Sequence, residues 1–150
     1  YMSKDLDLRK LLTFRLVALS REISHFNQRT LNPTDDLNIP QLRMLSLHYT
    51  LGRSSQSDIV KHTSRVDPGN TSRYMKSLVT KGYLKSVRDE KDKRLKWLKL
   101  TAKGKKIAER YLQKRYLHNE DLTTQFTQAE LKQFDKLLAK AARFYEDQSG

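Results

Sequence analysis

The chain has 150 residues, with 30 Lys and Arg against 17 Asp and Glu, which gives a formal net charge of +13. This length fits one domain with extensions and excludes two independent enzyme lobes. Cysteine is absent, so disulfide scaffolds, thiolate metal sites and catalytic thiols are excluded together. The sequence contains neither an apolar run of about 18 residues nor the apolar core of a signal peptide, and we therefore expect a soluble, cytoplasmic protein.

The positive charge is concentrated in the middle of the sequence. Residues 53–106 carry 16 basic and 5 acidic side chains, whereas residues 1–52 carry 7 and 5 and residues 107–150 carry 7 and 7. A basic block between nearly neutral segments indicates a site for a polyanion, and nucleic acid is the leading candidate. A solvated basic face and a contact with an anionic membrane are the alternatives that charge alone leaves open.

The first part of the chain has helical spacing of apolar residues. The repeating positions are Leu8, Leu12, Leu16, Leu19, Ile23 and Phe26. They predict a long first helix from Leu8. Leu6, Phe14 and Val17 add apolar surface outside this stripe, so we expect part of the helix to pack against a second chain. Residues 27–38 are predicted to be a polar connection.

A second helix and a helix-turn-helix pattern follow. Pro40 suits the first turn of a helix that ends near Gly52. Ser55 and Asp58 have the spacing of a capping box that opens a short helix to about Thr63. After a turn at residues 64–66, Asp67 and Pro68 predict the N-cap and first position of a further helix that ends at Gly82. This spacing is typical of a DNA-binding helix-turn-helix, although a generic helical hairpin also satisfies it.

Two strand-like runs come next, at residues 83–88 and 95–100, on either side of a charged loop at residues 89–94. They predict a hairpin, whose register stays open because the alternation slips between Trp97 and Leu98. Thr101 is predicted to cap a long helix whose apolar positions run to Phe126. A capping box at residues 127–130 predicts the start of the last helix.

The order of these elements resembles the MarR family of bacterial winged-helix transcription regulators. The segments that carry the resemblance are residues 78–84, 92–94 and 100–104, which look like the family's helix end, wing tip and Leu-Thr-x-x-Gly helix start. The chain departs from the family at Ile59-Val60, where Leu-Ala is usual, and at Thr71, where an apolar residue is usual. The absence of cysteine excludes the members that sense oxidants through a thiol.

The resemblance implies a mainly α (α+β) fold with a winged helix-turn-helix lobe at residues 40–101. It also implies dimerisation helices at residues 4–30 and 102–148 in a single chain spanning 1–150. The family is homodimeric, and each subunit places a recognition helix in the major groove of DNA and a wing against the minor groove.

Helical phasing selects the candidate DNA-binding residues. With Thr71, Met75 and Leu78 inward, 100° per residue turns the opposite side toward the groove. That side consists of Gly69, Arg73, Lys76 and Thr80, with Asn70 and Ser77 at its flank. Gly69 permits close backbone approach, Asn70 suits an adenine edge, Arg73 suits a guanine edge or a phosphate, and Lys76 suits a phosphate. An ordinary exposed polar role is the alternative for each of them.

In the wing, Arg94 is the strongest candidate, because a narrow minor groove attracts an arginine and Asp92 can hold its guanidinium in position. The alternative is an ordinary exposed ion pair in a turn. The candidate phosphate contacts are Lys91, Lys93, Arg65, Ser55, Ser57, Arg53 and His62.

The sequence therefore predicts a sequence-specific regulator of transcription that binds double-stranded DNA as a homodimer at a pseudo-palindromic operator. We expect a repressor released by a small anionic or aromatic effector, for which Arg15, His25 and His48 are candidate contacts. No catalytic, metal-binding or cofactor-binding motif is apparent, so neither an enzyme nor a cofactor is expected. The competing hypotheses are a winged-helix protein that binds nucleic acid without sequence preference and a basic module that binds an acidic protein. Tyr111, Tyr116 and Trp97 are interpreted as core residues, with an effector cavity as the alternative.

Overall fold

The computed structural model describes residues 6–63 and 69–150. The chain divides into two compact units, Tyr1–Leu112 and Gln113–Gly150. Within the described ranges the protein is mainly α-helical, with one two-stranded antiparallel sheet. None of the helices in these ranges has both the length and the apolar content that a membrane crossing requires.

The first unit begins with three consecutive helical segments: η1 (Leu8–Lys10), α1 (Leu12–Phe26) and η2 (Asn27–Leu31). The prediction of an unbroken helix from Leu8 is wrong, because Leu11 has an extended backbone between η1 and α1. The prediction of a polar connection from residue 27 is also wrong, since η2 continues the chain as a π-helix. Leu31 at the end of η2 is buried in the hydrophobic core, which explains why the helical path continues that far.

Side-chain caps fix the starts of α2 (Ile39–Leu51) and α3 (Gln56–Thr63). Asn38 Oδ1 accepts from the amide of Gln41 at 2.9 Å, and Gln41 Oε1 accepts from the amide of Asn38 at 3.0 Å. Ser55 and Asp58 form the same reciprocal pair at the start of α3, with distances of 3.1 Å and 2.9 Å. These pairs occupy amides that a helix start leaves without partners, so both helices begin where the sequence predicts.

Helix α4 (Thr71–Thr80) begins later than the sequence indicated. Gly69 and Asn70 have φ values of +82° and +20°, which lie outside the helical region, so the helix begins only after them, at Thr71. Asp67 and Pro68, the predicted N-cap and first position, lie outside the described residues.

The hairpin consists of β1 (Leu84–Arg88) and β2 (Lys96–Leu100), with Leu84 opposite Leu100 and Arg88 opposite Lys96. Ser54 also pairs with β2, because its amide and carbonyl both bond to the backbone of Leu98, at 3.1 Å and 2.8 Å. This extra pairing accounts for the slipped alternation. Leu98 packs against the core while Trp97, directly before it, is half-buried on the other face of the strand.

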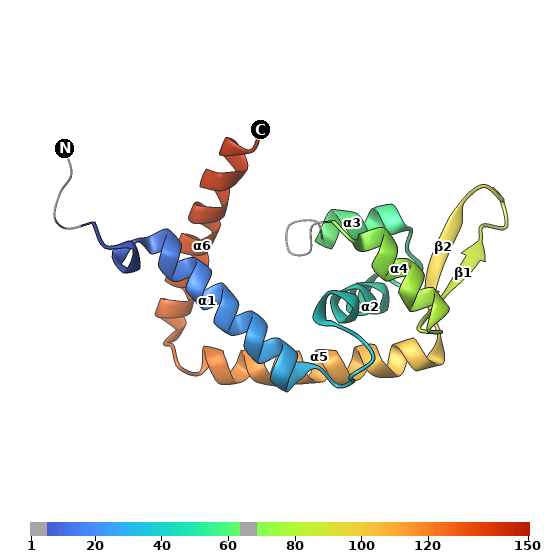
Figure 1. The fold of residues 1–150 in the computed structure, drawn as a ribbon, viewed down its shortest axis with the longest axis horizontal. Coiled ribbons are helices and arrows are strands. Elements are labelled where there is room, and N and C mark those ends of the chain that lie inside the picture. Colours follow the sequence, from blue (N-terminus) through green and yellow to red (C-terminus); the bar gives the residue numbers. More distant parts are fainter. Residues whose placement is uncertain (1–5, 64–68) are drawn as a thin grey trace. The chain divides into compact units, whose positions relative to one another are not determined.

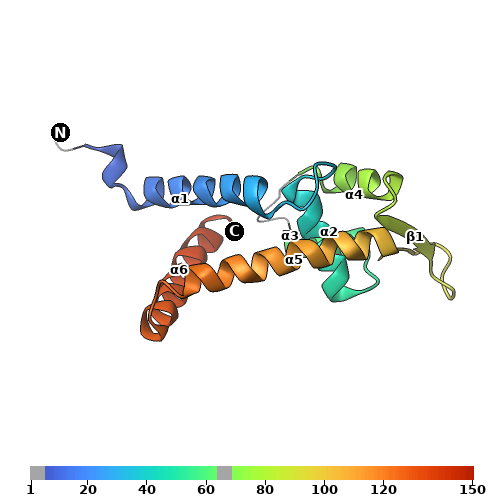
Figure 2. The ribbon, with the colours of Figure 1, turned by 90° about the horizontal axis from the view of Figure 1, so that it is seen from below.

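The core of the first unit lies between α2, α3, α4, β1 and the first part of α5 (Ala102–Thr123). Figure 1 shows these helices gathered beside the N-terminal turns of α5, with the hairpin projecting from the group. The same projection of the hairpin is visible from below in Figure 2. The fully buried side chains include Leu42, Met44, Leu45, Ile59, Leu78, Leu84 and Tyr111.

Thr101 and Gly104 explain why the start of α5 fits against β1. Thr101 Oγ1 accepts from the amide of Gly104 at 3.1 Å and donates to the carbonyl of Gly82 at 2.6 Å, which confirms Thr101 as the cap. A Cβ atom at position 104 would overlap the carbonyl oxygen of Tyr83. Only glycine allows the helix to approach the backbone of Tyr83, directly before β1, so closely.

The second unit contains the end of α5 and helix α6 (Gln128–Gln148). Thr127 and Glu130 form the predicted capping box, at 3.1 Å and 2.9 Å. Helix α5 ends at Thr123, so its predicted extension to Phe126 is wrong. The extended backbone that Thr127 needs as an N-cap requires a turn before it, and Phe126 lies in that turn with its ring 5.9 Å from that of Phe134.

Gly104→Ala is expected to lower the free energy of unfolding by about 2–4 kcal/mol, since a backbone carbonyl must move to admit the methyl group. Elsewhere in a helix, replacement of glycine by alanine is stabilising by about 1 kcal/mol, so the sign is diagnostic. Urea denaturation measures the change, with Gly150→Ala as the control at the exposed chain end. Equal stability of the Gly104→Ala variant and the parent would contradict the close approach.

Candidate nucleic-acid interface

Helix α4 has one buried and one exposed face, as helical phasing predicts. Thr71, Met75 and Leu78 are buried in the core, with exposed fractions of 8%, 3% and 0%. Arg73, Lys76 and Thr80 are exposed on the helix surface. The arrangement leaves two basic side chains, three residues apart, on the outer face of a short helix that is anchored by its inner face.

Three other candidate residues of this region do not lie where helical phasing places them. Ser77 is half-buried, and its hydroxyl accepts from Gln41 Nε2 at 3.3 Å, so it faces α2. Gly69 and Asn70 are exposed but precede the helix, so helical phasing does not apply to them. Arg65 lies outside the described residues.

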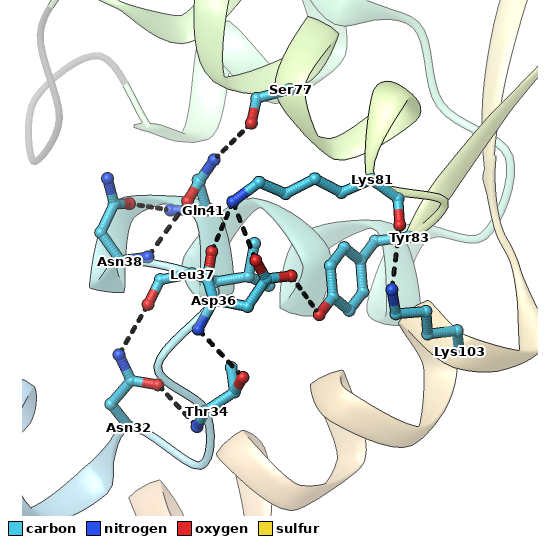
Figure 3. A network of polar contacts seen from close by, with 10 residues as sticks. All are labelled: Asn32, Thr34, Asp36, Leu37, Asn38, Gln41, Ser77, Lys81, Tyr83 and Lys103. Atoms are coloured by element: carbon cyan, nitrogen blue, oxygen red, sulfur yellow. Dashed lines mark hydrogen bonds and ion pairs between the residues drawn. The ribbon is translucent and has the colours of Figure 1, made fainter.

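A polar network holds the C-terminal end of α4 (Figure 3). Lys81 Nζ lies 3.1 Å from Asp36 Oδ1, and the Tyr83 hydroxyl donates to Asp36 Oδ2 at 2.7 Å. These two hydrogen bonds, that of Tyr83 first, lower the pKa of Asp36. Lys103 Nζ in turn donates to the carbonyl of Lys81 at 3.0 Å and lies 4.3 Å from the Tyr83 ring. The end of α4 is thereby joined to the loop before α2 and to the start of α5.

Asp89 shapes the tip of the hairpin. Its Oδ1 accepts from the amides of Lys91 and Asp92 at 2.8 Å and 3.0 Å, and its Oδ2 accepts from Trp97 Nε1 at 2.9 Å. These bonds, with the Asp92 amide contributing most, lower the pKa of Asp89. The Arg53 guanidinium lies 4.5 Å from the centre of the Trp97 ring and 3.9 Å from Asp89 Oδ2. A carboxylate, an indole and a guanidinium therefore set the path of the loop.

Arg94 extends from this tip, with 91% of its side chain exposed. Its Nε lies 3.2 Å from Asp92 Oδ1, which also accepts from the Arg94 amide at 3.1 Å. Asp92 thus contacts the guanidinium in the way the sequence suggested. Lys91 and Lys93 are exposed at the same tip.

The other candidate phosphate contacts surround α3. Ser57 and His62 are exposed, as is Arg53, whose guanidinium stacks on Trp97. The hydroxyl of Ser55 serves as the cap of α3. Within the described ranges, no group of three or more acidic or histidine side chains is arranged to hold a metal ion.

The candidate effector contacts separate into two kinds. Arg15 and His25 are exposed on α1, whereas His48 is buried, with 1% of its surface exposed. Neither ring nitrogen of His48 has a hydrogen-bond partner within the described part of the chain, and burial lowers its pKa to about 4. Of the aromatic candidates, Tyr111 is buried in the core and Tyr116 is 70% exposed.

His48 also lines a surface cavity of about 500 Å³. The other lining residues are Tyr49, Gly52, Arg53, Lys99, Leu100, Thr101, Ala102 and Lys105. Sequence reasoning missed Tyr49, Lys99 and Lys105, because no spacing pattern links the end of α2 with the end of β2 and the start of α5. Only the packing of these three elements brings the residues together.

Known proteins share this arrangement. The sequence profile of the MarR family matches residues 37–96. A mutant MarR from Escherichia coli complexed with operator DNA is 28% identical, with a TM-score of 0.71, over 92% of this chain and 99% of that one. FabT from Streptococcus pneumoniae in complex with DNA is 22% identical, with a TM-score of 0.79, over 94% and 99%.

The PcaV transcriptional regulator from Streptomyces coelicolor, in complex with its natural ligand, is 20% identical, with a TM-score of 0.74, over 95% of this chain and 98% of that one. No curated protein sequence matches the chain significantly. The structural similarity confirms a winged-helix fold that is mainly α with a small β wing.

The buried His48 predicts a dependence of stability on pH. Its pKa is about 4 in the folded protein against 6.5 when exposed, so the unfolded chain binds the proton more readily. Because protonation of the histidine favours the unfolded chain, the free energy of unfolding falls as the pH decreases from 6.5 toward 4. The total loss is about 3 kcal/mol, and above pH 6.5 none of it is present. Urea denaturation from pH 7 to pH 4 is expected to show this loss. Glutamine does not titrate, so the His48→Gln variant is expected to lose about 3 kcal/mol less over this pH range than the parent protein. If the unfolding free energy of both proteins depends on pH in the same way, His48 is not the group responsible.

Proposed function

We propose that this protein, a transcription regulator with a MarR-family domain at residues 37–96, binds a specific duplex DNA site as a homodimeric repressor and leaves it when a small ligand binds. In this proposal residues 40–101 are the DNA-binding lobe, and residues 4–30 and 102–148 supply the dimerisation helices. Such a protein acts on the chromosome, so a cytoplasmic location follows from the function.

The observation that carries the proposal is the pairing of an anchored basic helix with an anchored basic wing. Arg73 and Lys76 project from α4, whose inner face is buried, and Arg94 projects from a hairpin tip that Asp89 and Asp92 hold in shape. A helix of this size fits the major groove, and an exposed arginine is attracted by a narrow minor groove. The DNA-bound structures of MarR from E. coli and FabT support the same use of the fold.

Exposed apolar side chains support the homodimer. In the first unit, α1 has no buried residue, and Leu12 and Val17 are 67% and 57% exposed. In the second unit, α6 has no buried residue either, and Leu137 and Phe144 are 55% and 58% exposed. Helices with several large, exposed apolar side chains and no buried residue are typical of an interface that a second chain covers.

The same basic surface suits two other functions, which the DNA experiments separate. A winged-helix protein without sequence preference would bind unrelated duplexes equally at a fixed salt concentration. A basic module for an acidic protein would bind no duplex at all. The small ligand is supported by the PcaV complex as an analogy of fold.

Arg94→Ala and Lys76→Ala are expected to reduce DNA binding in different ways. Loss of a minor-groove arginine is expected to cost about 1–3 kcal/mol of binding free energy, with a larger loss on sites flanked by A·T pairs than by G·C pairs. Loss of a phosphate contact at Lys76 is expected to weaken all duplexes similarly and to reduce the salt slope by about one.

Titration of both variants against two flank sequences at several salt concentrations measures these effects. Lys85→Ala on β1 removes the same charge from an exposed position that is not among the proposed DNA contacts, and it serves as the control. If Arg94→Ala binds every duplex as tightly as the parent protein does, the wing does not contact DNA.

Sedimentation at micromolar concentration is expected to show about twice the chain mass of 17.7 kDa, because α1 and α6 leave large apolar surfaces uncovered. Footprinting is then expected to show two related half-sites about one helical turn apart. A monomer in the sedimentation measurement would contradict the dimeric arrangement. So would a DNA footprint that stays the same when one half-site is mutated.

A further inference from the structure

The side chain of Trp97 lies where the wing meets the segment between α2 and α3. Its indole Nε1 donates to Asp89 Oδ2 at 2.9 Å, and the guanidinium of Arg53 lies over its ring, 4.5 Å from the ring centre. Arg53 also lies 3.9 Å from Asp89 Oδ2. Each of these three side chains, which form the tryptophan cluster, therefore contacts the other two.

The segment that carries Arg53 is itself held by β2 and α3. The amide and carbonyl of Ser54, the next residue, both bond to the backbone of Leu98, at 3.1 Å and 2.8 Å. The side chain of Ser55 then caps α3. Arg53 therefore contacts Trp97 from a well-anchored backbone, and the tryptophan cluster joins the wing to the start of α3.

Hydrogen bonds lead from the tryptophan cluster to Arg94 at the wing tip. Asp89 Oδ1 accepts from the amide of Asp92 at 3.0 Å, and Asp92 Oδ1 accepts from Arg94 Nε at 3.2 Å. Two backbone bonds close the same loop, from the amide of Asp89 to the carbonyl of Leu95 and from the amide of Leu95 to the carbonyl of Asp92, each 3.0 Å long. The orientation of the Asp89 carboxylate therefore affects the position of the arginine.

Trp97 is suited to this arrangement because an indole supplies both a ring face for a guanidinium and an N–H for a carboxylate. Its side chain is half-buried, whereas Arg94 has 91% of its side chain exposed. An exposed side chain on a restrained backbone loses less conformational freedom when it binds than one on a mobile loop does. A restraint on the loop is therefore expected to favour any contact that Arg94 makes.

We propose that Trp97 is a positioning residue for Arg94: together with Asp89 and Arg53, it holds the wing tip in the orientation in which this arginine enters the minor groove. The restraint on the tip exists without DNA, whereas its effect on the groove contact rests on the proposed function. Through Arg94, Trp97 increases the preference for narrow, A·T-rich grooves without touching the DNA.

Limited proteolysis of the full-length protein tests the restraint without DNA. Trypsin cleaves after basic residues, and Lys91, Lys93 and Arg94 supply sites within the tip. Trp97→Phe keeps a ring for Arg53 but removes the N–H that bonds to Asp89. Cleavage within residues 91–94 is expected to accelerate about threefold to tenfold, the effect of one lost hydrogen bond, while cleavage elsewhere keeps its rate.

Val87→Ala is the matched control for the proteolysis. Val87 lies directly opposite Trp97 in the hairpin, and its side chain has no hydrogen-bond donor for Asp89. The control therefore weakens the same position of the sheet without removing the bond of interest. Unchanged cleavage of the tip in Trp97→Phe, or equal acceleration in Trp97→Phe and Val87→Ala, would overturn the restraint.

A double-mutant cycle with duplex DNA tests the link to Arg94. Trp97→Phe is expected to weaken binding of the parent protein to an A·T-flanked duplex about threefold to tenfold, and to weaken binding to a G·C-flanked duplex less. In the Arg94→Ala background the same substitution is expected to leave the affinity unchanged, because the side chain that it positions is absent.

Equal weakening by Trp97→Phe in both backgrounds is what a purely structural role produces, and it would overturn the positioning role. Equal weakening on both flank sequences would do the same. Failure of the parent protein to bind any duplex would overturn the proposed function and with it the groove contact, and the proteolysis would still decide whether Trp97 restrains the tip.

Discussion

The structure of the first unit depends on the junction at Tyr83. The backbone amide of Tyr83 donates to Leu78 at 2.9 Å, and its carbonyl accepts from the amide of Thr101 at 3.1 Å, so one residue ends α4, precedes β1 and receives the start of α5. Gly104 keeps the space beside that carbonyl open, and the hydroxyl of Tyr83 reaches Asp36 in the loop before α2. The contacts of Tyr83 thus join the end of the exposed helix α4, the start of the wing and the start of α5 at one buried residue.

Local patterns predicted most of the fold, because caps and apolar spacing act over a few residues. Ser55 with Asp58, Thr127 with Glu130 and Thr101 with Gly104 all form the contacts that their spacing indicates. The predicted helix bounds were wrong where a contact with a distant residue or an unusual backbone conformation determines the structure. The π-helix that carries Leu31 to the core and the positive φ of Asn70 have no signal in their own segments.

The same division holds for the candidate site. Arg73, Lys76 and Arg94 are exposed as their positions in a helix and a turn suggest, and Asp92 contacts Arg94 because the two are close in sequence. The stacking of Arg53 on Trp97 was beyond local reasoning, since it depends on the pairing of Ser54 with Leu98 across more than forty residues. Likewise, only tertiary packing brings Lys99 and Lys105 to one cavity.

In the hairpin tip, the residues that fix the path of the loop differ from most of those that form its exposed surface. Asp89 holds the loop through backbone amides and the Trp97 indole, so the side chains of Glu90, Lys91 and Lys93 take no part in the contacts that fix the loop path. Such a loop tolerates replacement of these side chains while its geometry is retained. On the proposed function, related regulators can therefore diverge in the flanking sequences they prefer by exchanging tip residues, without first having to evolve a new scaffold.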